Sequence, residues 1–127
     1  MAHPSDRVYS KEHEWVLVDG SVATIGISSF AQDQLGEVVY VDLPSTGDTL
    51  NAGDSFGEIE SVKSVSELFA PVTGQILEVN DALSDSPETV NSDPHGTGWM
   101  IKVRIEDEGE LDALLSAEDY DAFITEG

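Results

Sequence analysis

The sequence contains no cysteine and few basic residues. Without cysteine the chain forms no disulfide, offers no thiolate to a metal and has no cysteine nucleophile, while its redox compartment stays open. Five lysine and arginine residues stand against 26 acidic ones, a formal net charge of −21. A nucleic-acid backbone requires the opposite charge, so nucleic acid is not an expected partner. The excess of acidic residues favours basic protein surfaces or cationic groups as partners. Alternatively, it serves solubility and adaptation to a salty cytoplasm.

Long apolar runs are also missing. No segment approaches the length of a membrane span, and residues 1–6 lack the apolar or basic amphipathic character of an export or import signal. We therefore expect a cytoplasmic protein without a membrane partner. The 127 residues fit one domain, and the 39% apolar residues, spread along the chain, argue against disorder. Repulsion between like charges favours a monomer.

Short apolar segments between turn residues predict a mainly β protein. Asp19-Gly20 is a strong hairpin signal, whereas Pro87 and Pro94 rule out a long helix through residues 80–98, which we expect to form a surface loop with one short helical turn. The predicted strands cover residues 14–18, 21–27, 37–43, 75–79 and 99–105. Frequent turns and short strands are typical of a β-sandwich or barrel.

Predicted helices are short. The pattern Ser29-x-x-Gln32 resembles a capping box and predicts a helix over residues 29–35. Near the C-terminus an apolar stripe at residues 111–115 and a second capping pattern, Ser116-x-x-Asp119, predict two further helices that pack against the sheets.

The region around Lys63 gives two conflicting signals. Apolar residues recur every third position from Phe56 to Leu68, which is closer to a helical stripe than to strand alternation and would make Lys63 and Glu67 an i,i+4 pair. A helix over 55–68 would, however, interrupt short strands on both sides. The context therefore favours two strands that meet at Val62-Lys63.

No credible catalytic or metal-binding pattern is present. His3, His13 and His95 are far apart in the sequence, and alternate residues of Glu12-His13-Glu14 would point to opposite faces of a strand. Gly96-Thr97-Gly98 lacks the third glycine and the context of a nucleotide loop, and no nucleophile elbow occurs. The chain is thus predicted to be a carrier or binding module and not an enzyme.

Six segments of the chain carry a family resemblance. Glu60-Ser61-Val62-Lys63-Ser64 looks like a lipoylation motif, and five further segments follow the same family in order. They cover residues 10–16, 22–27, 31–36, 70–74 and 98–102. Together they resemble the H proteins of the glycine cleavage system over roughly residues 9–124. Ser64 stands where alanine is common in that family, and Gln34 where some members carry histidine.

The resemblance implies a fold and a cofactor. The implied fold is a barrel-sandwich hybrid of the lipoyl/biotinyl-carrier type, with two antiparallel sheets, short helices and a C-terminal helical extension. It would form a single lipoyl-binding domain over 1–127, with a core at about 9–105 and C-terminal helices at about 108–125. Lys63 would lie at a hairpin tip and carry lipoic acid through an amide bond, which supplies the sulfur chemistry that the cysteine-free chain lacks.

The resemblance also implies a shuttle function in glycine catabolism and one-carbon metabolism. The carried aminomethyl group would pass from the P protein, a pyridoxal-phosphate glycine decarboxylase, to the T protein, an aminomethyltransferase. The L protein, dihydrolipoamide dehydrogenase, would reoxidise the arm, and a lipoate ligase or lipoyl transferase would attach it. The H protein itself would catalyse none of these steps.

An aminomethyl group on sulfur is cationic and open to attack by water, so the carrier benefits from a partly dry cleft lined by carboxylates. The resemblance makes Glu14 and Glu67 the candidates for contact with this group, and Glu12 would make the cleft entrance more acidic. The alternative interpretation is that Glu14 is a charge at a strand edge and Glu67 a solvated hairpin residue.

Four other protein classes are alternatives. A biotinyl carrier places its lysine between methionines, whereas Lys63 lies between Val62 and Ser64. A lipoyl domain of a 2-oxoacid dehydrogenase lacks the C-terminal extension and typically carries Asp-Lys-Ala at its tip. A lipoyl relay protein, which donates its lipoyl group to 2-oxoacid dehydrogenase domains, stays open as an alternative, as does an unmodified acidic binding module.

Overall fold

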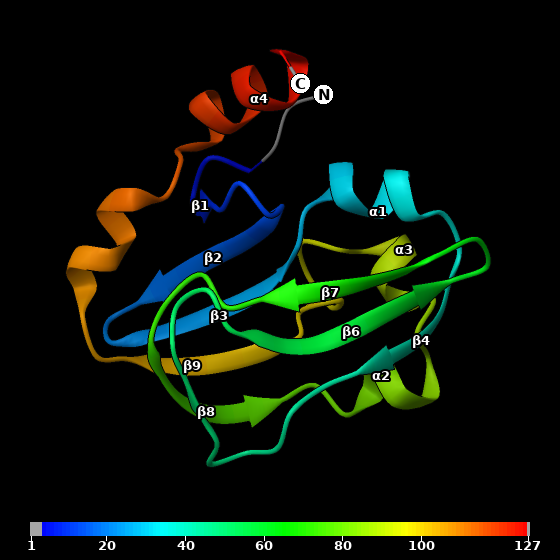
Figure 1. The fold of residues 1–127 in the computed structure, drawn as a ribbon, viewed down its shortest axis with the longest axis horizontal. Coiled ribbons are helices and arrows are strands. Elements are labelled where there is room, and N and C mark those ends of the chain that lie inside the picture. Colours follow the sequence, from blue (N-terminus) through cyan, green and yellow to red (C-terminus); the bar gives the residue numbers. More distant parts are fainter. Residues whose placement is uncertain (1–3, 127) are drawn as a thin grey trace.

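The computed structural model describes residues 4–126 and contains two antiparallel sheets that face each other (Figure 1). The larger sheet has the strand order β1-β2-β3-β9-β8-β5, and the smaller has the order β4-β6-β7. The strands of the larger sheet are β1 (Val8–Tyr9), β2 (Glu14–Asp19), β3 (Val22–Ile27), β9 (Ile101–Ile105), β8 (Gly74–Val79) and β5 (Thr49–Leu50). Those of the smaller sheet are β4 (Val38–Asp42), β6 (Ser55–Ser61) and β7 (Val65–Phe69). The predicted mainly β fold with two antiparallel sheets is confirmed.

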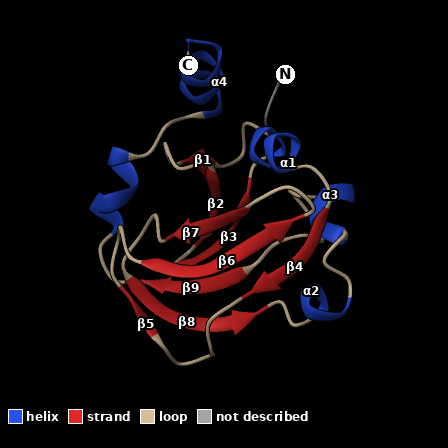
Figure 2. Ribbon diagram, turned by 45° about the vertical axis from the view of Figure 1, so that its right-hand side comes forward, coloured by secondary structure: helices blue, strands red, loops and turns tan. Residues whose placement is uncertain are grey.

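The helices lie at the ends and edges of this sandwich (Figure 2). They are α1 (Ser29–Leu35), α2 (Ala82–Asp85), α3 (Thr89–Ser92), the 3₁₀ helix η1 (Glu108–Ala113) and α4 (Ala117–Glu126). Residues 80–98 contain two helices where the sequence predicted one helical turn. The reason is burial, because Leu83 on α2 and Val90 on α3 are fully buried and fasten both helices to the core. No helix within residues 4–126 combines the length and apolarity needed to cross a membrane.

The core fills the space between the two sheets. On β9, Ile101, Val103 and Ile105 point inward while Arg104 is exposed, as expected for a strand with one buried face. Ile59 on β6 is fully buried on the opposing sheet. The strand predicted from residue 99 begins at Ile101.

The helical interpretation of residues 55–68 is wrong. Strands β6 and β7 pair antiparallel, with Glu58 opposite Glu67. The three-residue spacing between Phe56 and Ile59 arises because the pairing shifts between Ser55 and Gly57, which lets both side chains point into the core. The other members of the apparent stripe include two exposed valines, at positions 62 and 65, so the stripe is not one buried face.

One of the two helix caps predicted from the sequence is confirmed, and the other is displaced by one residue. Helix α1 is capped by Ser28, whose Oγ accepts a hydrogen bond from the Ala31 amide at 3.2 Å. The cap therefore lies one residue before the predicted Ser29, because Ser28 has the extended backbone of an N-cap. The predicted cap at Ser116 is confirmed, since its Oγ accepts from the Asp119 amide at 3.2 Å.

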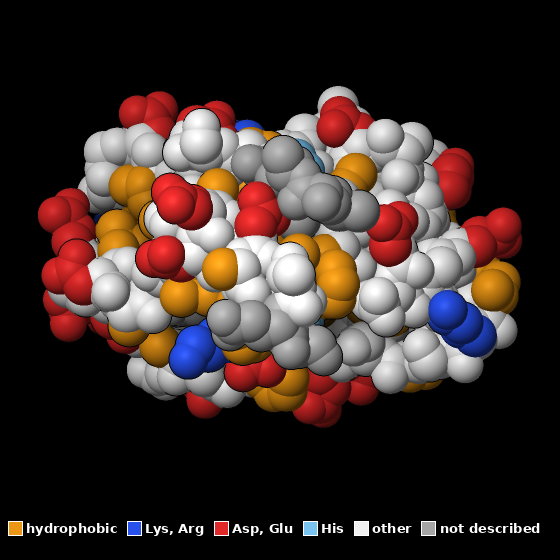
Figure 3. Space-filling model, turned by 90° about the horizontal axis from the view of Figure 1, so that it is seen from above, with side chains coloured by type: hydrophobic (Ala, Val, Ile, Leu, Met, Phe, Trp, Pro, Cys, Tyr) orange, Lys and Arg blue, Asp and Glu red, His pale blue; other side chains and the backbone are white. Residues whose placement is uncertain are grey.

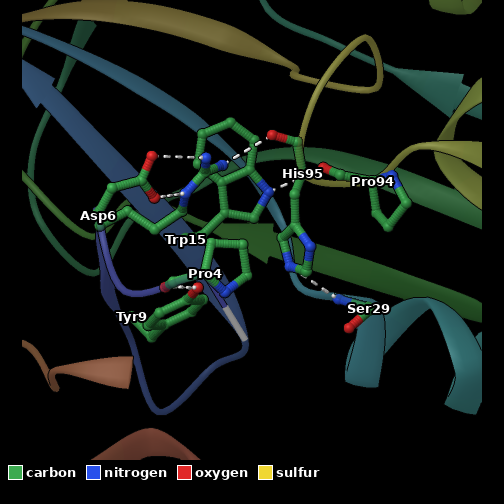
Figure 4. A network of polar contacts seen from close by, with 8 residues as sticks. Pro4, Asp6, Tyr9, Trp15, Ser29, Pro94 and His95 are labelled. Carbon is green, nitrogen blue, oxygen red and sulfur yellow. Dashed lines mark hydrogen bonds and ion pairs between the residues drawn. The ribbon is translucent and has the colours of Figure 1, made fainter. Parts of the chain in front are cut away.

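The segment around Arg7 is held against the 93–98 loop by the network in Figure 4. The Arg7 guanidinium lies 4.6 Å from the centre of the Trp15 ring and donates to the His95 carbonyl at 2.7 Å. The Trp15 indole donates to the Pro94 carbonyl at 2.9 Å. On the other side of β1, the Tyr9 ring stacks on Tyr120 of α4 at 4.7 Å. These contacts explain why the two-residue strand β1, which the sequence did not predict, is ordered.

Gly74 on β8 lies directly against the backbone of β9. A Cβ atom there would overlap the Arg104 carbonyl oxygen on the neighbouring strand. Gly74→Ala is therefore expected to destabilise the fold by about 1–3 kcal/mol, since a packed backbone must move to make room. Urea unfolding measures the loss. Gly109→Ala is the matched control, because a Cβ there meets only an exposed side chain, and an equal loss in both variants would contradict the prediction.

Candidate functional site

A cleft of about 390 Å³ opens between β7, helix α1 and the segment that leads into β2. Its walls include the three carboxylates that the sequence singled out, Glu12, Glu14 and Glu67. Apolar side chains form much of the rest of the lining, namely Ile27, Phe30, Ala31, Leu35, Ile59 and Leu68. The structure thus brings together residues from four separate segments of the chain.

Glu14 is almost entirely buried, with 1% of its surface exposed. Its Oε1 accepts a hydrogen bond from the Ser10 hydroxyl at 2.6 Å, and its Oε2 accepts one from the Phe69 amide at 3.4 Å. No basic side chain in residues 4–126 forms an ion pair with it. Glu14 is therefore not a solvated charge at a strand edge.

Burial raises the pKa of Glu14 to about 8, although the hydrogen bonds from Ser10 and Phe69 act in the opposite direction. The carboxyl group accordingly holds its proton at neutral pH when no cation is near. A cation brought into the cleft would favour the ionised form and take the place of that proton. The other two carboxylates, Glu12 and Glu67, are exposed at the rim.

Lys63 lies in the turn between β6 and β7, where it is exposed. The Ser61 hydroxyl accepts hydrogen bonds from the Lys63 amide at 3.3 Å and from the Ser64 amide at 3.1 Å, and the Ser61 amide donates to the Ser64 carbonyl at 2.8 Å. Outside the hairpin, the Val62 amide donates to the Glu37 carbonyl at 3.0 Å. The turn is thus closed by local bonds and attached to the body of the protein. Its neighbour Ser64 lines the cleft.

His13 is a cleft residue that the sequence did not single out for this role. It is the one non-glycine residue with positive φ within residues 4–126, at 73°. Its Nδ1 lies 2.8 Å from the Tyr120 hydroxyl, which in turn lies 2.7 Å from the Ser28 hydroxyl. Burial lowers the pKa of His13, so its ring adds no positive charge to the cleft at neutral pH. Neither the backbone conformation nor the partner on distant α4 has a sequence signal.

No group of three or more potential metal ligands exists within the described part of the chain. His13 and His95 lie in different networks, and His3 falls outside the described residues.

The sequence of this chain matches a protein-family model described as Glycine cleavage H-protein over residues 7–127. The chain belongs to the glycine cleavage H-protein family. The glycine cleavage system H protein of Carboxydothermus hydrogenoformans is 55% identical over 123 residues, covering 97% of this chain and 95% of the relative. That of Staphylococcus epidermidis is 56% identical over 126 residues, covering 99% and 100%.

The fold points to the same family. The crystal structure of a glycine cleavage system H protein from Mycobacterium marinum matches with a TM-score of 0.88 and 41% sequence identity. The match covers 96% of this chain and 98% of that one. The barrel-sandwich fold expected from the resemblance is therefore confirmed.

Family membership also establishes the kind of function. As an H protein, the chain is a lipoyl-carrying shuttle of the glycine cleavage system. It is a carrier component of that system and not one of its enzymes.

Proposed function

We propose that Lys63 is the residue to which the lipoyl group is attached, and that the cleft beside it shelters the loaded end of the arm. The main support is the position of Lys63 at an exposed hairpin tip one residue from a cleft-lining serine, Ser64. The other two lysines lie over aromatic rings, with Lys11 Nζ 5.9 Å from the Phe123 ring centre and Lys102 Nζ 5.0 Å from that of Trp99. Lys63 differs from both, because it lies in an exposed turn at the tip of a hairpin, where a modifying enzyme can reach it.

The lining of the cleft suits a lipoyl arm chemically. Its apolar wall, which includes Leu35, Ile59 and Leu68, suits a hydrocarbon chain and a dithiolane ring. The group, when bound, supplies the sulfur that accepts and releases an aminomethyl unit. The chain has no cysteine that could take its place.

Glu14 then holds the cationic amine. Its carboxyl oxygens lie in a site screened from water, where a charge-assisted hydrogen bond to an ammonium group is strong. Glu14 would release its proton to water as the cation enters, so that the buried pair of carboxylate and ammonium is neutral as a whole. Glu12 and Glu67 at the rim would attract the amine without burying it.

The proposed partners are the P, T and L proteins and the ligase or transferase that attaches the lipoyl group. The charge of the surface favours partner enzymes that dock through basic faces. The face in Figure 3 shows many acidic side chains and few lysines or arginines. We also infer that residues 1–127 form a single lipoyl-binding domain. The monomeric state and the cytoplasmic location stay predictions.

Co-expression with a lipoate ligase tests the proposal. The intact protein is expected to gain one lipoyl mass, and peptide mapping is expected to place that mass on Lys63. The free lysine amine is consumed in the amide, so the modified chain also loses one positive charge. A lipoyl mass found on Lys11 or Lys102 would contradict the assignment.

A further inference from the structure

The segment between helix α1 and strand β4 lies beside the hairpin tip that carries Lys63 (Figure 1). In this segment the Glu37 carbonyl accepts the hydrogen bond from the Val62 amide at 3.0 Å. Within the described part of the chain, this is the one hydrogen bond that joins residues 62–64 to a segment outside the hairpin. The preceding Gly36 lies next to the Lys63 side chain, since a Cβ atom on Gly36 would be 3.5 Å from Lys63 Cε.

Asn91 on helix α3 holds this segment from both sides of Glu37. Its Nδ2 donates to the Gly36 carbonyl at 2.8 Å, and its Oδ1 accepts from the Val38 amide at 2.8 Å. The amide orientation is determined by its partners, because only this orientation pairs a donor with the carbonyl and an acceptor with the N–H. The neighbouring Val90 is fully buried, so helix α3, which carries Asn91, is attached to the core.

These bonds form a continuous path from the core to the lysine. It runs from α3 through Asn91 to residues 36–38, from Glu37 to Val62, and from there to Lys63. The bonds of Ser61 set the shape of the turn but not its position, because they lie within the hairpin. The bond to Glu37 sets its position relative to the cleft.

We infer that Asn91 is a positioning residue for Lys63: it holds the 36–38 segment at the place where that segment anchors the hairpin tip. The inference rests on the proposed attachment at Lys63. An enzyme that modifies the lysine binds the hairpin only when its tip is in the competent position. A fall in the population of that position raises the apparent KM in proportion and leaves kcat unchanged.

Three variants separate this role from general stability. Asn91→Leu removes both hydrogen bonds at similar size, and Asn91→Asp keeps the acceptor for the Val38 amide while losing the donor to Gly36. Asn80→Leu is the matched control from the same 80–98 region. The Asn80 Nδ2 donates to the Thr97 and Trp99 carbonyls at 3.0 and 2.7 Å, away from the hairpin.

The first readout is amide hydrogen exchange, followed by NMR on the unmodified protein. Asn91→Leu is expected to speed exchange at Val62 and Val38 roughly tenfold, since local opening of the anchored segment becomes easier. Asn91→Asp should speed it as well, because a carboxylate oxygen would face the Gly36 carbonyl oxygen in place of the donor. Asn80→Leu should leave the Val62 rate unchanged once any difference in global stability is subtracted.

The second readout is the steady-state kinetics of lipoate attachment by a lipoate ligase. Asn91→Leu is expected to raise the apparent KM for the protein several-fold with kcat unchanged. Asn91→Asp should raise the apparent KM as well, and Asn80→Leu should match the wild type.

Two results would overturn the inference. One is a Val62 exchange rate in both Asn91 variants equal to that of the wild type, and the other is an equal acceleration in Asn80→Leu. If Asn91→Leu does not fold, Asn91→Asp carries both readouts. Failure of the proposed function is seen separately, as a wild-type chain that gains no lipoyl mass on Lys63, and the exchange readout would still decide the role of Asn91.

Discussion

Lys63→Arg is expected to abolish the attachment of a lipoyl group to this chain. Arginine keeps the positive charge and most of the length of lysine, but its guanidinium does not form the amide. The exposed hairpin tip should accept the substitution without loss of stability, because the Lys63 side chain is exposed. Intact-mass measurement after co-expression with a lipoate ligase should therefore show only the unmodified chain.

The same variant should also lack carrier activity. In an assay reconstituted with P, T and L proteins, glycine cleavage is expected to fall to the level measured without any H protein, because no other residue of the chain can carry the group. Lys102→Arg is the matched control, since Lys102 lies on β9 against Trp99 and should leave both mass and activity unchanged. Residual activity in Lys63→Arg would mean that another group carries the aminomethyl unit.

Residues near the attachment site could be predicted from the sequence because they lie in local motifs. The segment around Lys63 resembles a known motif, and turn residues on both sides of it predicted short strands in place of a helix. The local apolar spacing was misleading, since a shift in the β6–β7 pairing imitates a helical period. The choice between a helix and two strands was decided by the turn residues on either side and by the family resemblance.

What the sequence could not provide is burial and pairing between distant segments. Glu14 was predicted to contact the arm, yet nothing in the sequence indicated that it is 1% exposed and hydrogen-bonded to Ser10 and Phe69. The two bonds of Asn91 reach across 55 and 53 positions of sequence. Such contacts depend on tertiary packing, and a polar residue in a loop-like segment carries no signal of them.

The second large effect is expected at Glu14. In the loaded protein, Glu14→Gln should speed the loss of the aminomethyl group by roughly tenfold, because it replaces a charge-assisted hydrogen bond with a neutral one. Glutamine keeps the size and an acceptor for the Ser10 hydroxyl and loses only the long bond from the Phe69 amide, so the cleft should keep its shape. The decay is measured as release of formaldehyde and ammonia from the purified loaded protein.

Glu67→Gln is the matched control, because it also removes one negative charge from the lining of the cleft. Glu67 is exposed, so water can replace its carboxylate as the hydrogen-bond partner of the amine. Its effect on the decay should therefore be much smaller. Equal decay rates in Glu14→Gln and the wild type would show that burial of Glu14 has no protective role.

In the unloaded protein, Glu14→Gln should increase the stability of the fold at high pH, although it weakens protection of the aminomethyl group in the loaded protein. With a pKa of about 8 in the folded state and an ordinary value near 4.5 when unfolded, Glu14 binds its proton more tightly in the folded chain. Its contribution to stability is then fully present below the unfolded value and is lost as pH rises through about 8. Urea unfolding at pH 5 and pH 9 should show this loss in the wild type and not in Glu14→Gln, which is expected to be the more stable protein at pH 9. If Glu14→Gln is more stable than the wild type without the aminomethyl group and loses that group faster when loaded, the buried carboxyl contributes to the loaded state and not to the stability of the unloaded fold. In the loaded state the cation compensates the buried negative charge. A variant less stable than the wild type at pH 9 would contradict this explanation.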